Sequence, residues 1–208
     1  MDFIFCDTNK RLIDFLRECI SPNMFSSPHV KSIQFVVGDI NLFDGQTPGF
    51  CFVHPTNSKG ILDGELDKRM TEMFPELQSD VTLCVASSFQ FPVFSTLFTP
   101  CANQRYVASV SCMTNPGPPS VRNSSGRNAF FATYVMLSAL VEAVRSGTGI
   151  HTVIVPGMCA GRRRNRKQNV AMQMRDAFHV AFVQNKLLKD RTQAAHPRLF
   201  VHKLFDTY

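Results

Sequence analysis

The stretch VHPTNSKGILDGELD, residues 53–67, joins two segments of different character. The apolar run CFVHP (51–55) leads into it and predicts a buried strand. A pattern with helical spacing leaves it and ends at Pro75; its apolar positions are Leu66, Met70, Met73 and Phe74. Between the strand and the helix lie one asparagine, two glycines and three acidic residues. A polar, flexible loop between two buried elements predicts a binding site, because helix N-termini expose unpaired N–H groups that favour anions.

Strands and helices alternate on both sides of this stretch. Before it, IFCD (4–7) and IQFVVGDI (33–40) predict strands. The helix expected between them has its apolar positions at Leu12, Phe15, Leu16 and Cys19. After it, residues 82–113 hold β-rich runs, notably TLCVASS (82–88) and RYVASVSCM (105–113).

The C-terminal half continues the alternation. The elements expected there are a loop at 114–126, a helix at about 127–146, a buried strand HTVIVPG at 151–157, a helix with the capping pair Asn165 and Gln168, and a strand RLFVHKLFD at 198–206. Strands that alternate with helices predict an α/β sandwich with a largely parallel sheet. Such sheets bind ligands in the crevice at the carboxyl ends of their strands.

A second loop, PGMCAGRRRN (156–165), repeats the arrangement of a buried strand, two glycines and a helix start. Gly60 and Gly64 in the first loop, like Gly157 and Gly161 in the second, would let the backbone come close to a ligand. Two such loops at one edge of a sheet predict a cradle for a diphosphate. For either loop alone, glycines that only turn the chain are the commoner explanation.

Length and cysteine content narrow the classes of protein to consider. The 208 residues predict a single domain, and no apolar run reaches the roughly 18 residues of a membrane span. The N-terminus lacks the basic and apolar regions of a signal peptide, and seven cysteines without a CxxC pair predict reduced thiols. We therefore expect a cytoplasmic or nuclear protein without membrane contact.

Sequence motifs for metals and common nucleotide cofactors are missing. The chain has no GxxxxGK[ST] phosphate loop, no GxGxxG dinucleotide motif and no HExxH or paired Cys/His set. We expect no metal and no cofactor. His54, His151 and His179 lie in apolar segments, so we predict that they are packed residues rather than ligands.

The basic residues are concentrated in RRRNRK (162–167), which holds five of the 22 Lys and Arg residues in a chain of net charge +6. A solvated helix start or a localisation signal is one interpretation. The other is a phosphate or polyanion contact, because Arg and Lys pair well with phosphate. The residues of that contact would be Arg162, Arg163, Arg164, Arg166 and Lys167.

The order and spacing of these segments resemble the macro-domain family, in the macro-like branch seen in bacterial and phage proteins. GDI (38–40) is similar to the family's GDI motif, residues 53–67 to its first binding loop, and VIVPGMCAG (153–161) to its second. DTN (7–9) and the QM pair at 173–174 match further positions of that branch. The resemblance covers nearly the whole chain, implies a three-layer α/β/α sandwich with a mixed, largely parallel sheet, and fits a viral or phage origin.

The resemblance also implies a pocket for ADP-ribose. Asp39 would accept the adenine amino group beside the Ile40 backbone, although a turn cap also explains this residue. Asn57 would orient the distal ribose, and Asp67 would assist an attacking water, unless it is only an exposed carboxylate that favours the helix dipole. The diphosphate loop would comprise Gly157, Met158, Cys159, Ala160, Gly161 and Arg162, with Phe205 or Tyr208 stacked on the adenine.

Three residues depart from the family pattern. His54 replaces the first Asn of the first loop, Ala160 replaces a Thr of the second, and Glu65 replaces a glycine beside the distal ribose. A buried Glu65 would need partners in the space that the ribose requires, so we predict obstruction and weak or absent hydrolase activity. Alternatively, Glu65 beside Asp67 forms an acid–base pair.

Three functions are consistent with the sequence. A hydrolase would release ADP-ribose from protein or nucleic acid, or deacylate O-acyl-ADP-ribose, with Asn57, Glu65 and Asp67 as its catalytic residues. A reader would bind ADP-ribose or a related nucleotide without turnover. A nucleic-acid-binding module would use residues 162–167, but this cluster lacks the aromatic residues typical of a single-strand groove.

Overall fold

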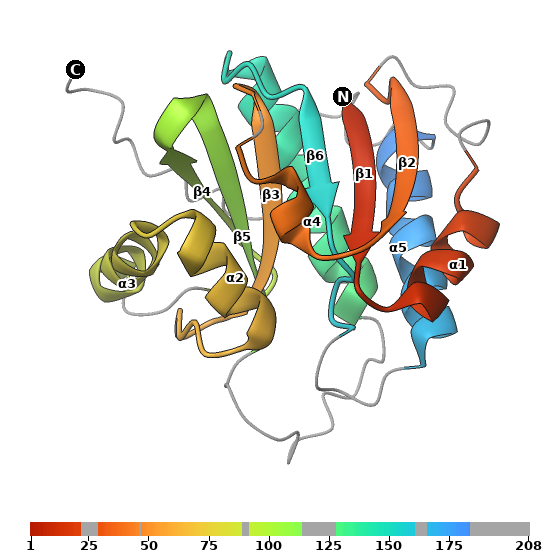
Figure 1. Cartoon of the computed structure of the whole chain (residues 1–208), viewed down its shortest axis with the longest axis horizontal. Coiled ribbons are helices and arrows are strands. Elements are labelled where there is room, and N and C mark those ends of the chain that lie inside the picture. Colours follow the sequence, from red (N-terminus) through yellow and green to blue (C-terminus); the bar gives the residue numbers. More distant parts are fainter. Residues whose placement is uncertain (22–28, 46, 89–91, 114–127, 161–165, 184–208) are drawn as a thin grey trace, which may run out of the picture.

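A six-stranded sheet with the order β2-β1-β6-β3-β5-β4 forms the centre of the protein (Figure 1). The computed structural model describes residues 1–21, 29–45, 47–88, 92–113, 128–160 and 166–183. The strands are β1 (Asp2–Asp7), β2 (Ser32–Val37), β3 (Phe50–Asn57), β4 (Thr96–Cys101), β5 (Arg105–Met113) and β6 (Thr152–Val155). Neighbouring strands run parallel except for β4 and β5, which are antiparallel.

Helices cover both faces of this sheet (Figure 1). One layer consists of α1 (Lys10–Cys19), α4 (Asn128–Arg145) and α5 (Lys167–Phe182), and the other of α2 (Glu65–Met73) and α3 (Leu77–Ser88). Each layer packs on the sheet through its own buried apolar cluster. The predicted three-layer sandwich with a mixed, largely parallel sheet is therefore confirmed.

The alternation of side chains along β1 shows how these two clusters form. Phe3 and Phe5 point into the cluster beneath α5, where both rings contact Phe178. Ile4 and Cys6 belong to the opposite cluster, beneath α2 and α3. A continuous apolar run is the expected sequence of a strand that is buried on both faces. No helix in the described ranges has the length and apolar character needed to cross a membrane.

One predicted strand is wrong, because TLCVASS (82–88) lies in α3. Val81 and Cys84, three residues apart on this helix, are buried in the cluster of the second layer, whereas Leu83 is 66% exposed. That pattern has a helical period, and packing of the buried side against the sheet outweighs the local β preference of the run.

Two boundaries also differ from the prediction. β2 ends at Val37 rather than at residue 40, because Asp39 caps a short 3-10 helix, η2 (Ile40–Phe43). α5 begins at Lys167 with Arg166 as its N-cap, so the predicted cap residue Asn165 is not at the helix start. Asn165 itself, the predicted loop at 114–126 and the predicted strand at 198–206 lie outside the described residues.

The three histidines predicted to pack have different environments. His54 is fully buried, which confirms the prediction for this residue. His179 is half-buried on α5. The prediction is wrong for His151, which is exposed at the start of β6 and lies within hydrogen-bonding distance of the Pro48 carbonyl and the Thr152 hydroxyl.

Candidate functional site

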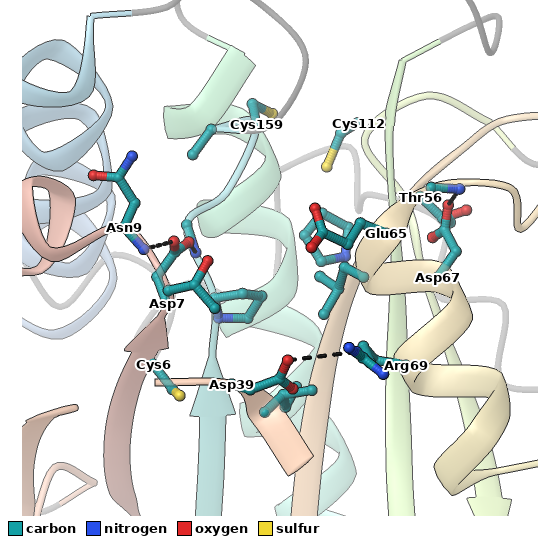
Figure 2. Close-up of a pocket in the computed structure, with 18 of the residues that line it drawn as sticks. Cys6, Asp7, Asn9, Asp39, Thr56, Glu65, Asp67, Arg69, Cys112 and Cys159 are labelled. Atoms are coloured by element: carbon teal, nitrogen blue, oxygen red, sulfur yellow. Dashed lines mark hydrogen bonds and ion pairs between the residues drawn. The ribbon is translucent and has the colours of Figure 1, made fainter. Parts of the chain in front are cut away.

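A pocket of about 520 Å³ opens at the carboxyl ends of β1, β3, β5 and β6, beside the start of α2 (Figure 2). Its walls come from residues 6–9, 38–40, 55–57, 63–67, 156–157 and 159–160, together with Arg69, Cys112 and Lys167. The two glycine-bearing loops thus meet at one edge of the sheet, which is where parallel sheets bind ligands.

The wall of this pocket carries an excess of negative charge. The acidic residues that line it are Asp7, Asp39, Asp63, Glu65 and Asp67, and the basic residues are Arg69 and Lys167. Five acidic and two basic side chains leave a net charge of −3 on the described part of the lining. The hydrogen bonds of each carboxylate therefore decide which of them are free to meet a ligand.

Asn57, at the end of β3, folds the first loop with its side chain. Its Oδ1 accepts hydrogen bonds from the N–H groups of Lys59 (3.0 Å) and Ile61 (3.3 Å), and its Nδ2 donates to the Ile61 carbonyl (2.6 Å). Asn57 is only 4% exposed, yet it lines the pocket. The amide group carries two hydrogens, and the second one has no hydrogen-bond partner among the described residues. Gly60 has a φ of +64° and packs against α3, away from the pocket lining.

Asp67 lies in the first turn of α2 with both carboxylate oxygens engaged. The Gly64 N–H donates to Oδ2 (2.7 Å), and His54 Nε2 lies 2.5 Å from Oδ1. An ionised carboxylate can only accept, so we assign a proton to His54 Nε2. The Asp67 side chain is 12% exposed. Its interpretation as an exposed first-turn carboxylate is therefore wrong, because the contact with His54 draws it towards β3.

Glu65 is the first residue of α2, and its side chain points into the pocket (Figure 2). The residue is exposed, and its carboxylate has no hydrogen bond or ion pair with any residue that the structure describes. The burial assumed for Glu65 is wrong, because the start of α2 borders the open pocket. Obstruction of a ribose by this side chain stays a prediction.

Asp7 anchors the second loop from the end of β1. Its Oδ2 accepts a hydrogen bond from the Gly157 N–H (3.1 Å), and the Ala160 N–H donates to the Gly157 carbonyl (3.2 Å). A Cβ at position 157 would lie 2.8 Å from both Asp7 Oδ2 and the Ala160 Cβ, and closer still to Leu12 Cδ2. Gly157 is thus required by close packing within the protein.

The rest of the second loop presents small groups to the pocket. Cys159 and Ala160 line it, whereas Met158 is fully buried in the core and does not. Cys159 has a φ of +60°, a left-handed conformation that is uncommon for residues other than glycine. Lys167 fixes the loop from the other side, because its ammonium group donates to the Ala160 carbonyl.

Asp39 occupies the opposite end of the pocket, below Glu65 in Figure 2. Its Oδ1 accepts a hydrogen bond from the Asn41 N–H (3.0 Å), which is the cap of η2. Its Oδ2 lies 3.4 Å from Arg69 Nε on α2, in an ion pair whose two side chains are 40% and 43% exposed. The capping interpretation of Asp39 is confirmed, and a contact with a base would have to share this carboxylate with Arg69. Ile40, beside it, also lines the pocket.

Cys6, Cys112 and Cys159 line the pocket, and none of the three forms a disulfide with a described residue. Burial and the neighbouring charges of Asp7 and Asp39 raise the pKa of Cys6 to about 11. Cys6 is therefore protonated at neutral pH and a weak nucleophile. Within the described ranges, no group of three or more His, Cys, Asp and Glu side chains is arranged to hold a metal ion.

Several predicted site residues lie outside the described part of the chain: Gly161, Arg162, Arg163, Arg164, Phe205 and Tyr208. Of the predicted polyanion contacts, Arg166 is exposed at the N-cap of α5 and Lys167 lines the pocket. The contact itself stays a prediction.

Asp7 and Arg69 line the pocket, although the sequence predictions give neither a binding role and mention Asp7 only within the DTN match at 7–9. A signal existed for each of them. Asp7 directly follows a predicted buried strand, and Arg69 is four residues after Glu65, on the same side of a predicted helix. Cys112 also lines the pocket, at the end of a strand that was predicted correctly.

Solved structures with a similar architecture identify the fold. The macrodomain of DarG from Mycobacterium tuberculosis superposes with a TM-score of 0.53 over 66% of this chain and 86% of its own, at 11% identity. The chain has a macro-domain fold. The DarG macrodomain of Thermus aquaticus, at 15% identity, gives a TM-score of 0.50 and covers 64% of this chain and 83% of its own.

A protein of unknown function from Bacteroides thetaiotaomicron superposes to a similar extent, with a TM-score of 0.51 and 14% identity, over 71% of this chain and 88% of its own. No protein-family model and no curated protein sequence matches the chain. At these identities the likeness is one of fold.

Proposed function

We propose that the pocket binds ADP-ribose or a related nucleotide. The observation that carries this proposal is a pocket of about 520 Å³ at the carboxyl edge of the sheet, between the two loops of a macro-domain fold. Pockets of roughly 300–1,000 Å³ are typical of small-molecule sites. In this proposal, following what the family resemblance implies, the adenine contacts Asp39 and Ile40, the diphosphate lies at the second loop and the distal ribose at the first loop.

The negative wall restricts where the phosphates can lie. Asp7, Asp39 and Asp67 already accept hydrogen bonds from the protein, so part of their charge is compensated. Glu65, on the α2 side of the pocket, accepts no hydrogen bond from the described residues, although its charge interacts with that of Arg69. The second loop carries Lys167 beside it. A diphosphate is therefore favoured at the second loop, which leaves the sugar beside Glu65.

Calorimetric titration with ADP-ribose tests this proposal, with ADP and adenosine as truncated ligands. We expect ADP-ribose to bind more tightly than either fragment, because only the complete ligand occupies both loops. The proposal would be overturned if millimolar ADP-ribose gave no heat of binding and left the melting temperature of the protein unchanged.

Hydrolysis of ADP-ribose linkages is the second candidate function, and the exposed carboxylate of Glu65 in the pocket supports it. ADP-ribosylated protein, ADP-ribosylated DNA and O-acyl-ADP-ribose should be incubated separately with the protein, and the released products measured. Binding without release identifies a reader. Binding of unmodified single-stranded DNA, with strong salt dependence and no effect of ADP-ribose, would instead favour the basic segment at 162–167 as the functional surface.

A further inference from the structure

We propose that His54 and Asp67 form an internal clamp on the start of α2, and that Glu65 is the catalytic carboxylate of the pocket. This inference rests on the proposed function. It reverses the roles that the family resemblance implies, in which Asp67 assists the attacking water. The reversal follows from His54, which stands where the family pattern has an asparagine.

Asp67 is poorly placed to take a proton from water. Its two oxygens are held by the Gly64 N–H and by His54 Nε2, at 2.7 and 2.5 Å. Its side chain is 12% exposed, although it borders the pocket. A group that activates water must have a free lone pair directed at that water. Asp67 would have to give up one of two strong interactions to provide it.

His54 is part of a polar strip inside the protein. It is fully buried on β3, and its Nδ1 lies 3.4 Å from the Ser109 hydroxyl on β5. His54 pairs with Ser109 in the strand register, and Thr56 pairs with Ser111 two residues further along. The hydroxyls of Thr56 and Ser111 are buried without a hydrogen-bond partner among the described residues. Because His54 does not line the pocket and contacts Asp67, which does, it acts among the described residues as a positioning residue.

The clamp fixes the rotation of α2. Asp67 turns towards β3, and Glu65 lies two residues earlier on the same helix. Two residues correspond to about 200° around a helix axis, so the Glu65 side chain leaves α2 in a different direction from that of Asp67, although both residues line the pocket. Glu65 points into the open part of the pocket (Figure 2). Gly64, as N-cap, completes the arrangement, because its N–H is bonded to the same carboxylate that His54 holds.

Glu65 then has the properties of a general base. Its carboxylate takes one proton from a water molecule, and the water oxygen forms a bond to the anomeric carbon of the distal ribose. The bond from that carbon to the carrier breaks, and its electron pair leaves with the carrier atom. The proton held by Glu65 passes to that atom or to solvent, which restores the carboxylate.

Amide hydrogen exchange tests the clamp without any ligand. In His54→Leu we expect the amides of Gly64 and Lys68 to exchange about tenfold faster, because both hydrogen bonds belong to the clamped helix start. Phe52→Leu is the matched control, since Phe52 is fully buried two residues earlier on the same face of β3 and does not line the pocket. His54→Gln should restore slow exchange, because its amide can donate to Asp67. Equal acceleration in the leucine variant and the control would overturn the clamp.

Turnover by single variants distinguishes the roles of the Glu65 and Asp67 carboxylates. We expect Glu65→Gln to lower kcat by about 100-fold without raising KM, because the carboxylate acts as a general base and is not needed for binding. Asp67→Asn keeps an oxygen for the Gly64 N–H and should lower kcat less than tenfold. A larger loss in Asp67→Asn or in Asp63→Asn than in Glu65→Gln would overturn the assignment of Glu65, and so would a wild type that binds ADP-ribose but releases none from ADP-ribosylated protein or DNA. If ADP-ribose does not bind at all, the proposed function fails, and the exchange experiment still decides whether the clamp exists.

Discussion

Each of the two loops at the pocket is held by the side chain of one polar residue, but the loops present different groups to a ligand. In the first loop, Asn57 folds the chain from within, and the loop leads to Glu65 and its exposed carboxylate. In the second, Asp7 reaches across from β1, and the loop presents Gly157 and Ala160. The first loop therefore presents a negative charge to the ligand, and the second loop, with its small side chains, allows the ligand to come close to the backbone. Substitutions in and beside each loop test this difference between them.

Gly157→Ala is expected to have the largest effect. The new methyl group would lie 2.8 Å from Asp7 Oδ2 and still closer to Leu12, which is fully buried and cannot move aside. Overpacking of this kind should lower the free energy of unfolding by about 3 kcal/mol. Urea denaturation measures it.

Gly38→Ala is the matched control for this substitution. Its methyl group would lie 2.5 Å from Leu42 Cδ1, which is the end of an exposed side chain that can rotate away. We expect a change below about 1 kcal/mol. Similar unfolding midpoints for the two variants would show that the second loop is not closely packed.

Asn57→Ala should disturb the first loop alone. The variant loses three hydrogen bonds from a residue that is 4% exposed, and we expect a loss of about 2 kcal/mol in the free energy of unfolding. Asn57→Asp retains the acceptor for Lys59 and Ile61 and should lie between the wild type and the alanine variant. Amide exchange should increase at Ile61 and remain unchanged at Ala160. Faster exchange at both positions would mean that the loops fold as one unit.

Most of the fold could be predicted because the buried elements have clear periods. β1, β3 and β5 read as apolar runs, and the amphipathic helix α1 has its apolar side chains at helical spacing. The prediction was wrong for α3, because its run TLCVASS is rich in residues that also suit strands. Only the packing of that helix on the sheet decides between the two structures.

The position of the site was predictable, but its internal contacts were not. Both loops follow predicted strands, and parallel strands bring their carboxyl ends to one edge. The contact of His54 with Asp67 depends on where α2 lies over β3, and that of Asp7 with Gly157 joins residues 150 positions apart. Neither pair has a local spacing that marks it. The free or bonded state of each carboxylate could not be predicted without these contacts.

Asp39 lies outside both loops, so its substitution shows whether residues beyond the two loops contribute to binding. We expect Asp39→Ala to weaken ADP-ribose by about 1.5 kcal/mol, the lower end for a hydrogen bond to a charged group, because the side chain is 40% exposed. Calorimetry measures the change. Arg69→Ala is the control, since it removes the ion pair and leaves the carboxylate free for the adenine. Equal weakening in both variants would show that the ion pair, rather than a contact of Asp39 with the base, matters for affinity.

Glu65→Gly should have the smallest effect on binding, with the opposite sign. The substitution removes both bulk and charge from the pocket wall, and relief of one repulsion at about 4 Å in water-like surroundings is worth about 1 kcal/mol of tighter ADP-ribose binding. Glu65→Gln separates the two causes, because it removes the charge and keeps the bulk. Equal gains in the two variants identify repulsion, whereas a gain in the glycine variant alone identifies obstruction. Weaker binding in both would mean that the carboxylate accepts hydrogen bonds from the ligand, and the first loop would then contribute affinity as well as charge. If Glu65 is also the general base, the glycine variant will bind more tightly while turnover is lost, because a catalytic group can oppose binding of the ground state that it helps to convert.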